Sequence, residues 1–181
     1  MVGINYFCSG FNFVSTMVAM QRIIPWLLIG LITPSALAQK ITVELETIGG
    51  KFKILAPDAA GRCQVLLENK VINRLNCQNA YAPIVIGRFR HLGNLEEVLV
   101  YQEIPRGNAC NGGPLYFLGI RADSTYTLSP PLDFCGGADP LLKQQGPKLF
   151  VTFPGGPPNR GTGSLPTQIW QYENGKLRKI K

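Results

Sequence analysis

The chain has 181 residues, of which 18 are basic and 11 acidic, and its formal net charge is +7. Its 20 glycines and 14 prolines leave little room for a long helix. The basic residues are spread along the chain with one cluster at 176–181, whereas a nucleic-acid-binding domain concentrates them in a stripe. We therefore expect no nucleic-acid partner. The charge suits an acidic protein, the anionic cell envelope, or simple solubility.

Residues 1–38 have the three parts of a secretory signal peptide. Arg22 is the only charged residue among them, an apolar run follows at 23–32, and Ala36-Leu37-Ala38 is a small-residue cleavage site. We expect cleavage after Ala38, which leaves residues 39–181 as one β-rich domain.

Met20 is a better start than Met1, because 20–38 is a complete signal by itself. Residues 1–19 would then be a misassigned extension. The alternative to a signal is a membrane anchor, but the apolar run is half the ~20 residues that a span needs. We therefore expect no stable membrane span in the mature chain.

Short runs of β-branched, aromatic and alternating apolar residues, separated by Gly, Pro, Asn and Asp, predict strands throughout residues 39–181. At most one or two helical turns are expected, around Asp139 to Lys143, where Asp139 would cap and Pro140 would begin the helix. The predicted fold is all-β, mainly an antiparallel meander that forms a sandwich or small barrel. The predicted strands are 41–47, 52–54, 63–67, 71–75, 84–89, 98–104, 115–120, 125–128, 149–153, 168–172 and 177–180.

Four cysteines, Cys63, Cys77, Cys110 and Cys135, follow the signal, and disulfides persist in oxidising compartments. The first pair is symmetric about a tight turn at Lys70, and the second is roughly symmetric about a polar turn at 122–123. Facing positions of a hairpin lie close to disulfide reach. Of the three possible connectivities we expect 63–77 and 110–135. The wide spacings argue against a zinc site, whose ligands come in closely spaced pairs.

The last segment contains the clearest hairpin and the longest loop. Residues 168–172 alternate, Asn174-Gly175 forms a turn, and 177–180 returns, which is the strongest short-range hairpin signal. Residues 154–166 are nearly all turn formers. Loops longer than about 12 residues are usually functional or disordered, so we expect an exposed loop here.

No catalytic constellation is apparent, and we expect no catalytic, cofactor-binding or metal-binding residue. His91 is the only histidine, and no nucleophile motif accompanies it. Alternation places Glu96 and Glu97 on opposite faces of a strand. Asp133 and Asp139 are explained by a turn and a cap more simply than by a cation site. Residues 107–113 are glycine-rich but lack the Lys-[ST] ending of a P-loop.

Two groups of residues are candidates for contacts with a partner protein. Exposed loop positions provide one group, and aromatic side chains, which dominate interface hot spots, provide the other. The alternative for the aromatic residues is a place in the sheet core. The candidates are Asn159, Arg160, Thr162, Ser164, Tyr101, Trp170 and Tyr172.

The second half of the chain has a recognisable layout. It runs Gly-Asn-Ala-Cys from Gly107, an aromatic strand, a polar turn, Phe134-Cys135-Gly136, an apolar strand, and an aromatic strand ending in Tyr-Glu-Asn-Gly-Lys-Leu. This layout resembles small exported, disulfide-bonded bacterial β-proteins, some of which neutralise toxins or cell-wall hydrolases in the periplasm. The resemblance rests on cysteine and turn placement and carries over no functional residue.

Three functions are therefore considered. The first is a periplasmic binding or inhibitory protein, immunity-like, whose partner is an acidic toxin or hydrolase. The absence of N-x-[ST] sequons from 39–181 also favours a bacterial periplasm over a eukaryotic exterior. The second is a structural or accessory envelope protein that associates with peptidoglycan or membrane by charge. The third and least favoured is a hydrolase that uses His91 or the carboxylates.

Overall fold

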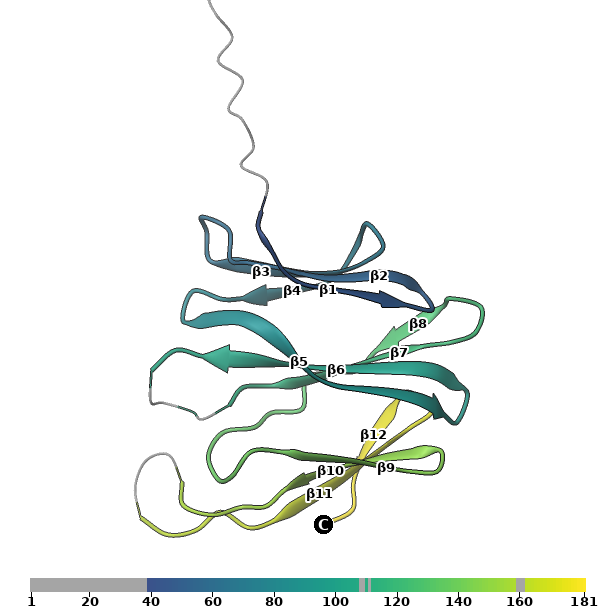
Figure 1. The fold of residues 1–181 in the computed structure, drawn as a ribbon. Coiled ribbons are helices and arrows are strands. Elements are labelled where there is room, and N and C mark those ends of the chain that lie inside the picture. Colours follow the sequence, from purple (N-terminus) through teal and green to yellow (C-terminus); the bar gives the residue numbers. More distant parts are fainter. Residues whose placement is uncertain (1–38, 108–109, 111, 159–161) are drawn as a thin grey trace, which may run out of the picture. The chain divides into compact units, whose positions relative to one another are not determined.

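Twelve antiparallel strands in three four-stranded sheets form the part of the chain that the computed structural model describes, residues 39–107, 110, 112–158 and 162–181 (Figure 1). No helix occurs in these residues. The predicted all-β class is confirmed. The predicted signal peptide lies outside the described residues.

Each sheet is a meander of consecutive strands, because every neighbour in sequence is also a neighbour in its sheet. The predicted antiparallel meander is confirmed, and none of the three sheets closes on itself in the described residues. The first sheet contains β1 (Ile41–Thr47), β2 (Gly50–Leu55), β3 (Arg62–Leu67) and β4 (Lys70–Asn76). The middle sheet contains β5 (Ala80–Leu92), β6 (Leu95–Pro105), β7 (Leu115–Ile120) and β8 (Tyr126–Leu128). The third sheet contains β9 (Leu141–Gln145), β10 (Lys148–Phe153), β11 (Gln168–Glu173) and β12 (Lys176–Lys179).

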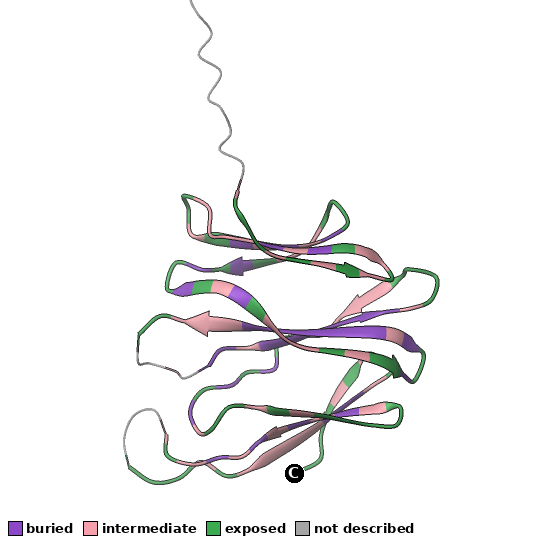
Figure 2. Cartoon of the chain, viewed as in Figure 1, coloured by how far each residue is buried: buried purple, intermediate pink, exposed green. Residues whose placement is uncertain are grey.

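The middle sheet lies between the other two, and its strands β6 and β7 are largely buried (Figures 1 and 2). Leu99 and Leu118 on one face pack against the first sheet in one hydrophobic cluster. Val100 and Phe117 on the other face pack against the third sheet in a second cluster. All six residues of β7 are buried, which explains the unbroken apolar run at 115–120, since a strand covered on both sides needs no polar face.

The expected helical turn at Asp139 to Lys143 is wrong. Residues 141–145 form β9, which pairs with β10, and Gly146 at a φ of 56° makes the turn between them. Leu142 packs into the second cluster. A full ladder of backbone hydrogen bonds together with this burial outweighs the weak local preference for a capped turn.

The two ends of the stack differ in their connections (Figure 1). Tight turns join odd-numbered strands to the even-numbered strands that follow, and they lie at one end. The connections from each even-numbered strand to the odd-numbered strand that follows lie at the other end, which we call the loop end. They are 56–61, 77–79, 106–114, 129–140 and 154–167. Binding residues are concentrated in loops that a rigid scaffold positions, so the loop end is a candidate binding surface.

An ion pair with a buried carboxylate ties the first sheet to the middle sheet at the turn end. Glu97 on β6 is fully buried and accepts a hydrogen bond from the Arg88 guanidinium on β5. Its other oxygen accepts the backbone N–H of Ile48, in the β1–β2 turn, at 2.9 Å. Arg88 also donates to the Glu46 carbonyl at 2.8 Å. Three strand segments from two sheets are thus held by one carboxylate and one guanidinium.

Candidate partner-binding surface

Both predicted disulfides are present in the described residues, at the loop end. Cys63 and Cys77 are bonded across the open end of the β3–β4 hairpin, with Cα atoms 5.7 Å apart. Cys110 is bonded to Cys135, with Cα atoms 4.9 Å apart, and joins the 106–114 connection to the 129–140 connection. Two disulfides in a domain of this size are typical of exported proteins.

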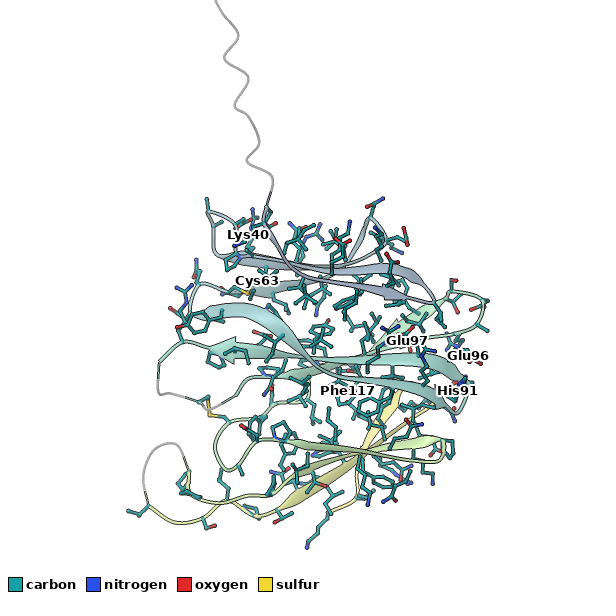
Figure 3. All side chains as sticks on the ribbon, viewed as in Figure 1. Lys40, Cys63, His91, Glu96, Glu97 and Phe117 are labelled. Atoms are coloured by element: carbon teal, nitrogen blue, oxygen red, sulfur yellow. A yellow bond between two sulfur atoms is a disulfide. The ribbon has the colours of Figure 1, made fainter. Side chains whose placement is uncertain are left out.

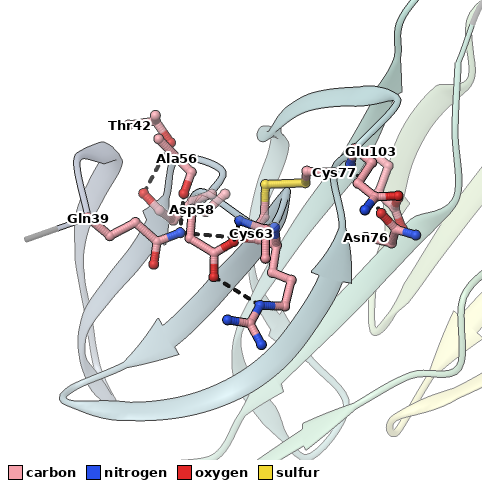
Figure 4. Close-up of a disulfide and its surroundings, with 12 residues drawn as sticks. Gln39, Thr42, Ala56, Asp58, Cys63, Asn76, Cys77 and Glu103 are labelled. Carbon is pink, nitrogen blue, oxygen red and sulfur yellow. Dashed lines mark hydrogen bonds and ion pairs between the residues drawn. A yellow bond between two sulfur atoms is a disulfide. The ribbon is translucent and has the colours of Figure 1, made fainter. Parts of the chain in front are cut away.

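The turn at Asp58 is held by side-chain hydrogen bonds and lies beside the first disulfide (Figure 4). One Asp58 oxygen accepts the backbone N–H groups of Ala60 and Arg62, each at 2.9 Å, and the other accepts Nε of Arg62 at 2.9 Å. These bonds, led by the one from the Arg62 backbone, hold the pKa of the Asp58 carboxyl below its usual value. Gln39 donates to the carbonyls of Ala56 and Arg62 and fastens the segment before β1 to the same turn.

Open grooves flank this turn. One groove, of about 510 Å³, runs from Gln39 to Arg62 along the Asp58 turn. Another, of about 340 Å³, lies on the side of Cys77 and Arg106. Arg106 sits over the ring of Tyr81, 5.1 Å from its centre, and Tyr81 is 57% exposed. The loop end therefore has two open grooves beside the hydrogen-bonded Asp58 turn, and an accessible pair of Arg106 and Tyr81.

Two of the aromatic residues expected to contact a partner are in the core, so this part of the prediction is wrong. Tyr101 and Tyr172 are fully buried. Tyr101 stacks on Tyr116 with ring centres 5.1 Å apart, and its hydroxyl accepts a hydrogen bond from Asn73 at 2.9 Å. Trp170 is half-buried and packs against the second cluster. Alternation in a three-layer stack turns these side chains towards a neighbouring sheet, not towards solvent.

Burial also controls the ionisation of these tyrosines. It raises the pKa of Tyr101, and it raises that of Tyr116, whose hydroxyl donates to the Glu103 carboxylate. It raises the pKa of Tyr172 to about 12. Tyr172 stacks on Phe117 at 5.0 Å between the middle and third sheets. These groups stay neutral at physiological pH and serve packing.

The predicted loop at 154–166 is exposed where it is described, but its base is fixed. Thr162 and Ser164 are exposed. Gly156 pairs with Leu165 in an isolated bridge, which closes the base. The base is also bonded to the segment after Cys135, since the N–H of Ala138 donates to Gly155 at 2.9 Å. Candidates Asn159 and Arg160 lie outside the described residues.

The groups considered for catalysis are apart from the loop end. His91 and Glu96 lie at the β5–β6 turn, at the opposite end of the middle sheet (Figure 3). His91 Nδ1 is 3.0 Å from the Glu96 carboxylate, with both side chains well exposed. Glu97 points the other way into its ion pair, as alternation predicts. In the part of the chain with described coordinates, no group of three or more His, Cys, Asp or Glu is placed to hold a metal ion.

One surface that the candidate residues did not include is the outer face of the third sheet. Residues 39–139 contain ten basic and ten acidic residues and are formally neutral, whereas 140–181 contain seven basic residues and one acidic residue. The basic residues are spread along the chain as described above, but the net charge is not. This imbalance of charge can be read from the sequence, since no acidic residue occurs between Asp139 and Glu173.

No family model, curated protein sequence or solved structure matches this chain. Among the described residues, no helix is both long and apolar enough to cross a membrane.

Proposed function

We propose that this protein is an exported binding protein of the bacterial periplasm that acts by contact with another protein, in the manner of an immunity protein or a hydrolase inhibitor. The observation that carries the proposal is the loop end. Five connections begin and end there, and two disulfides, the Asp58 turn and the hydrogen bond from Ala138 to Gly155 hold parts of them that the structure describes. A preorganised surface loses little entropy on association and can bind tightly without a deep pocket.

The placement of the titratable groups supports binding over hydrolysis. The exposed His91–Glu96 pair is at the other end from the grooves, and the buried Glu97 is used by a structural ion pair. Catalytic acids and bases work best when a cleft brings them together and perturbs their pKa values. Asp58 is the one carboxylate among the residues that line the two grooves, and it is already hydrogen-bonded. The charged side chains beside it are Lys40, Arg62 and Arg106, which suits surface recognition.

The test is site-specific photo-crosslinking in the native host. A photoreactive amino acid replaces Ser164, in the loop at 154–166, or Tyr81, beside Arg106 at the loop end. A matched control carries it at Lys53, on the outer face of the first sheet. We expect a discrete protein adduct from the loop-end positions and none from Lys53. Adducts of equal yield from all three positions, or none from any across several growth conditions, would refute a partner-binding loop end.

A further inference from the structure

We propose that the outer face of the third sheet is the part of the binding surface that recognises an acidic protein. This inference rests on the proposed function and names the chemistry of the partner. The strand pairing decides which side chains share the face. Leu142, Val151 and Tyr172 point into the second cluster, so their neighbours in sequence point outwards.

The outward side chains form ordered rows across the four strands. Leu141 pairs with Thr152, Thr152 pairs with Ile169, and Ile180 is hydrogen-bonded to Ile169. Leu141 is 60% and Ile180 47% exposed. This row is largely apolar, and it lies where the strands enter and leave the loop at 154–166. Exposed aliphatic side chains in a row are unusual on a solvated sheet and mark an interaction surface.

The next row towards the turn end has a basic residue on each outer strand, with Phe150 and the buried Gln171 between them. Lys143 pairs with Phe150, Phe150 with Gln171, and Gln171 with Arg178, whose guanidinium donates to the Gln171 side chain at 3.4 Å. Beyond them lie Lys148 and Lys176. Glu173 is the single acid of the sheet, and its carboxylate is 3.9 Å from Lys148 Nζ. An apolar strip beside positive charge fits a partner with acidic residues around an apolar contact.

The outer face of the first sheet shows that this pattern is specific. There Glu44 and Glu46 alternate with Lys51 and Lys53 across β1 and β2. Lys51 lies 3.6 Å from Glu44 and 3.5 Å from Glu46, and these two carboxylates raise its pKa, Glu46 contributing more. Both carboxylates of that face are therefore paired within the molecule. Among the described residues of the third sheet, Lys143, Lys176 and Arg178 lie in no ion pair and are left for a partner.

The size of the face indicates why a loop is needed beside it. Four strands about 4.8 Å apart, each with about five residues of about 3.3 Å, cover roughly 300 Å² in projection. A standard protein interface buries about 800 Å² on each partner. The face alone is too small, but the exposed residues Thr162 to Ser164 extend it at the apolar row. The loop and the sheet face together approach the size of a specific interface.

The test compares two variants with the same change in charge. One is Lys143→Glu/Arg178→Glu on the proposed face, and the matched control is Lys53→Glu/Arg74→Glu on the outer face of the first sheet. Binding to poly-L-glutamate is measured by fluorescence anisotropy over a salt series, after thermal melts show that both variants fold. We expect the wild type to bind poly-L-glutamate at low salt. The affinity of the face variant should fall about tenfold or more, and that of the control should stay within about twofold of the wild type.

Three results would overturn the inference. Equal losses in both variants would mean that the charge acts without a defined face. Absence of wild-type binding to poly-L-glutamate at low salt would exclude an acidic polypeptide as occupant. Tighter binding to phosphatidylglycerol vesicles than to poly-L-glutamate, lost in the face variant, would identify an anionic lipid surface instead. The face variant could lose affinity for poly-L-glutamate as expected while no crosslinked partner is found. In that case the proposed function fails, and the third sheet is still a site for acidic polypeptides.

Discussion

Replacing Glu97 by alanine should destabilise the protein more than any other single change of an acidic residue. The Glu97 side chain has no exposed surface and accepts hydrogen bonds from the Arg88 guanidinium and the Ile48 backbone N–H. Glu97→Ala leaves both donors without this acceptor, at the point where the first sheet meets the middle sheet. The neighbouring Glu96 provides a matched control, because it is half-exposed and pairs only with the exposed His91.

The size of the effect follows from the contacts. A hydrogen bond to a charged group contributes about 1.5–3 kcal/mol, and an unsatisfied buried donor costs about 1–3 kcal/mol. The Arg88 side chain is 38% exposed and can recover part of its hydration, so we expect a loss of about 3 kcal/mol in the free energy of unfolding. With an unfolding entropy of about 2.1 cal/mol/K per residue, this lowers Tm by about 10 °C. Glu97→Gln keeps one acceptor and should lose about half as much.

Urea unfolding followed by circular dichroism measures the loss, and the slope of free energy against urea should not change. Glu96→Ala should stay within about 0.5 kcal/mol of the wild type, as exposed ion pairs usually do. Arg88→Ala should cost at least as much as Glu97→Ala, because it leaves a buried carboxylate without its cation. If Glu97→Ala and Glu96→Ala were equally stable, the ion pair would not hold the two sheets together.

Three further predictions concern the disulfide, the spacing of the sheets and the buried tyrosines. Cys63→Ala/Cys77→Ala should lower the free energy of unfolding in urea by about 3 kcal/mol, from the loop that the bond closes; an unchanged midpoint would mean that strand pairing alone holds this hairpin. Gly119→Ala should lower the free energy of unfolding by about 1–3 kcal/mol, because the added Cβ would lie 2.7 Å from Leu95 Cδ1 and 2.8 Å from the Tyr172 hydroxyl. A variant as stable as the wild type would show that the middle and third sheets can move apart to make room for it. The Tyr172 pKa is raised from 10.0 to about 12 by burial, so its contribution to stability is complete below the unfolded pKa and is lost as pH rises towards 12. Tyrosinate absorbance and circular dichroism should then change together, and ionisation of Tyr172 near pH 10 in the folded protein would contradict this.

Local signals predicted most of the strands and both disulfides. Alternation at 41–47 and the Asn174-Gly175 turn depend only on neighbouring residues, and each is found where expected. The cysteine pairs were predicted from symmetry about a turn, and both bonds are present. The symmetry is only approximate, since Cys63 faces Leu75 in the ladder and Cys77 follows the end of β4. The strand at 141–145 was missed because Leu-Leu-Lys-Gln-Gln has neither alternation nor β-branched residues. It becomes a strand by pairing with β10.

The layering could not be predicted from alternation, and this explains the error over the aromatic residues. A period of two shows that Tyr101 and Tyr172 share a face with certain neighbours, but not whether another sheet covers that face. Only the unbroken apolar run at 115–120 indicated a strand buried on both sides. The basic face was overlooked for a different reason. Its charges are separated in sequence by the loop at 154–166, and pairing between β10 and β11 brings them together.

The order in which the three sheets occur along the chain determines how the protein can fold as it is made. A chain emerges from its N-terminus, so the first and middle sheets are available before the third. Until 141–181 emerge, Val100 and Phe117 on the middle sheet have nothing to cover them. A chain that folds as it emerges would therefore pass through a stage with an open hydrophobic sheet, and such a surface favours aggregation. Residues 141–181, which carry the excess positive charge, would end this stage by covering the middle sheet.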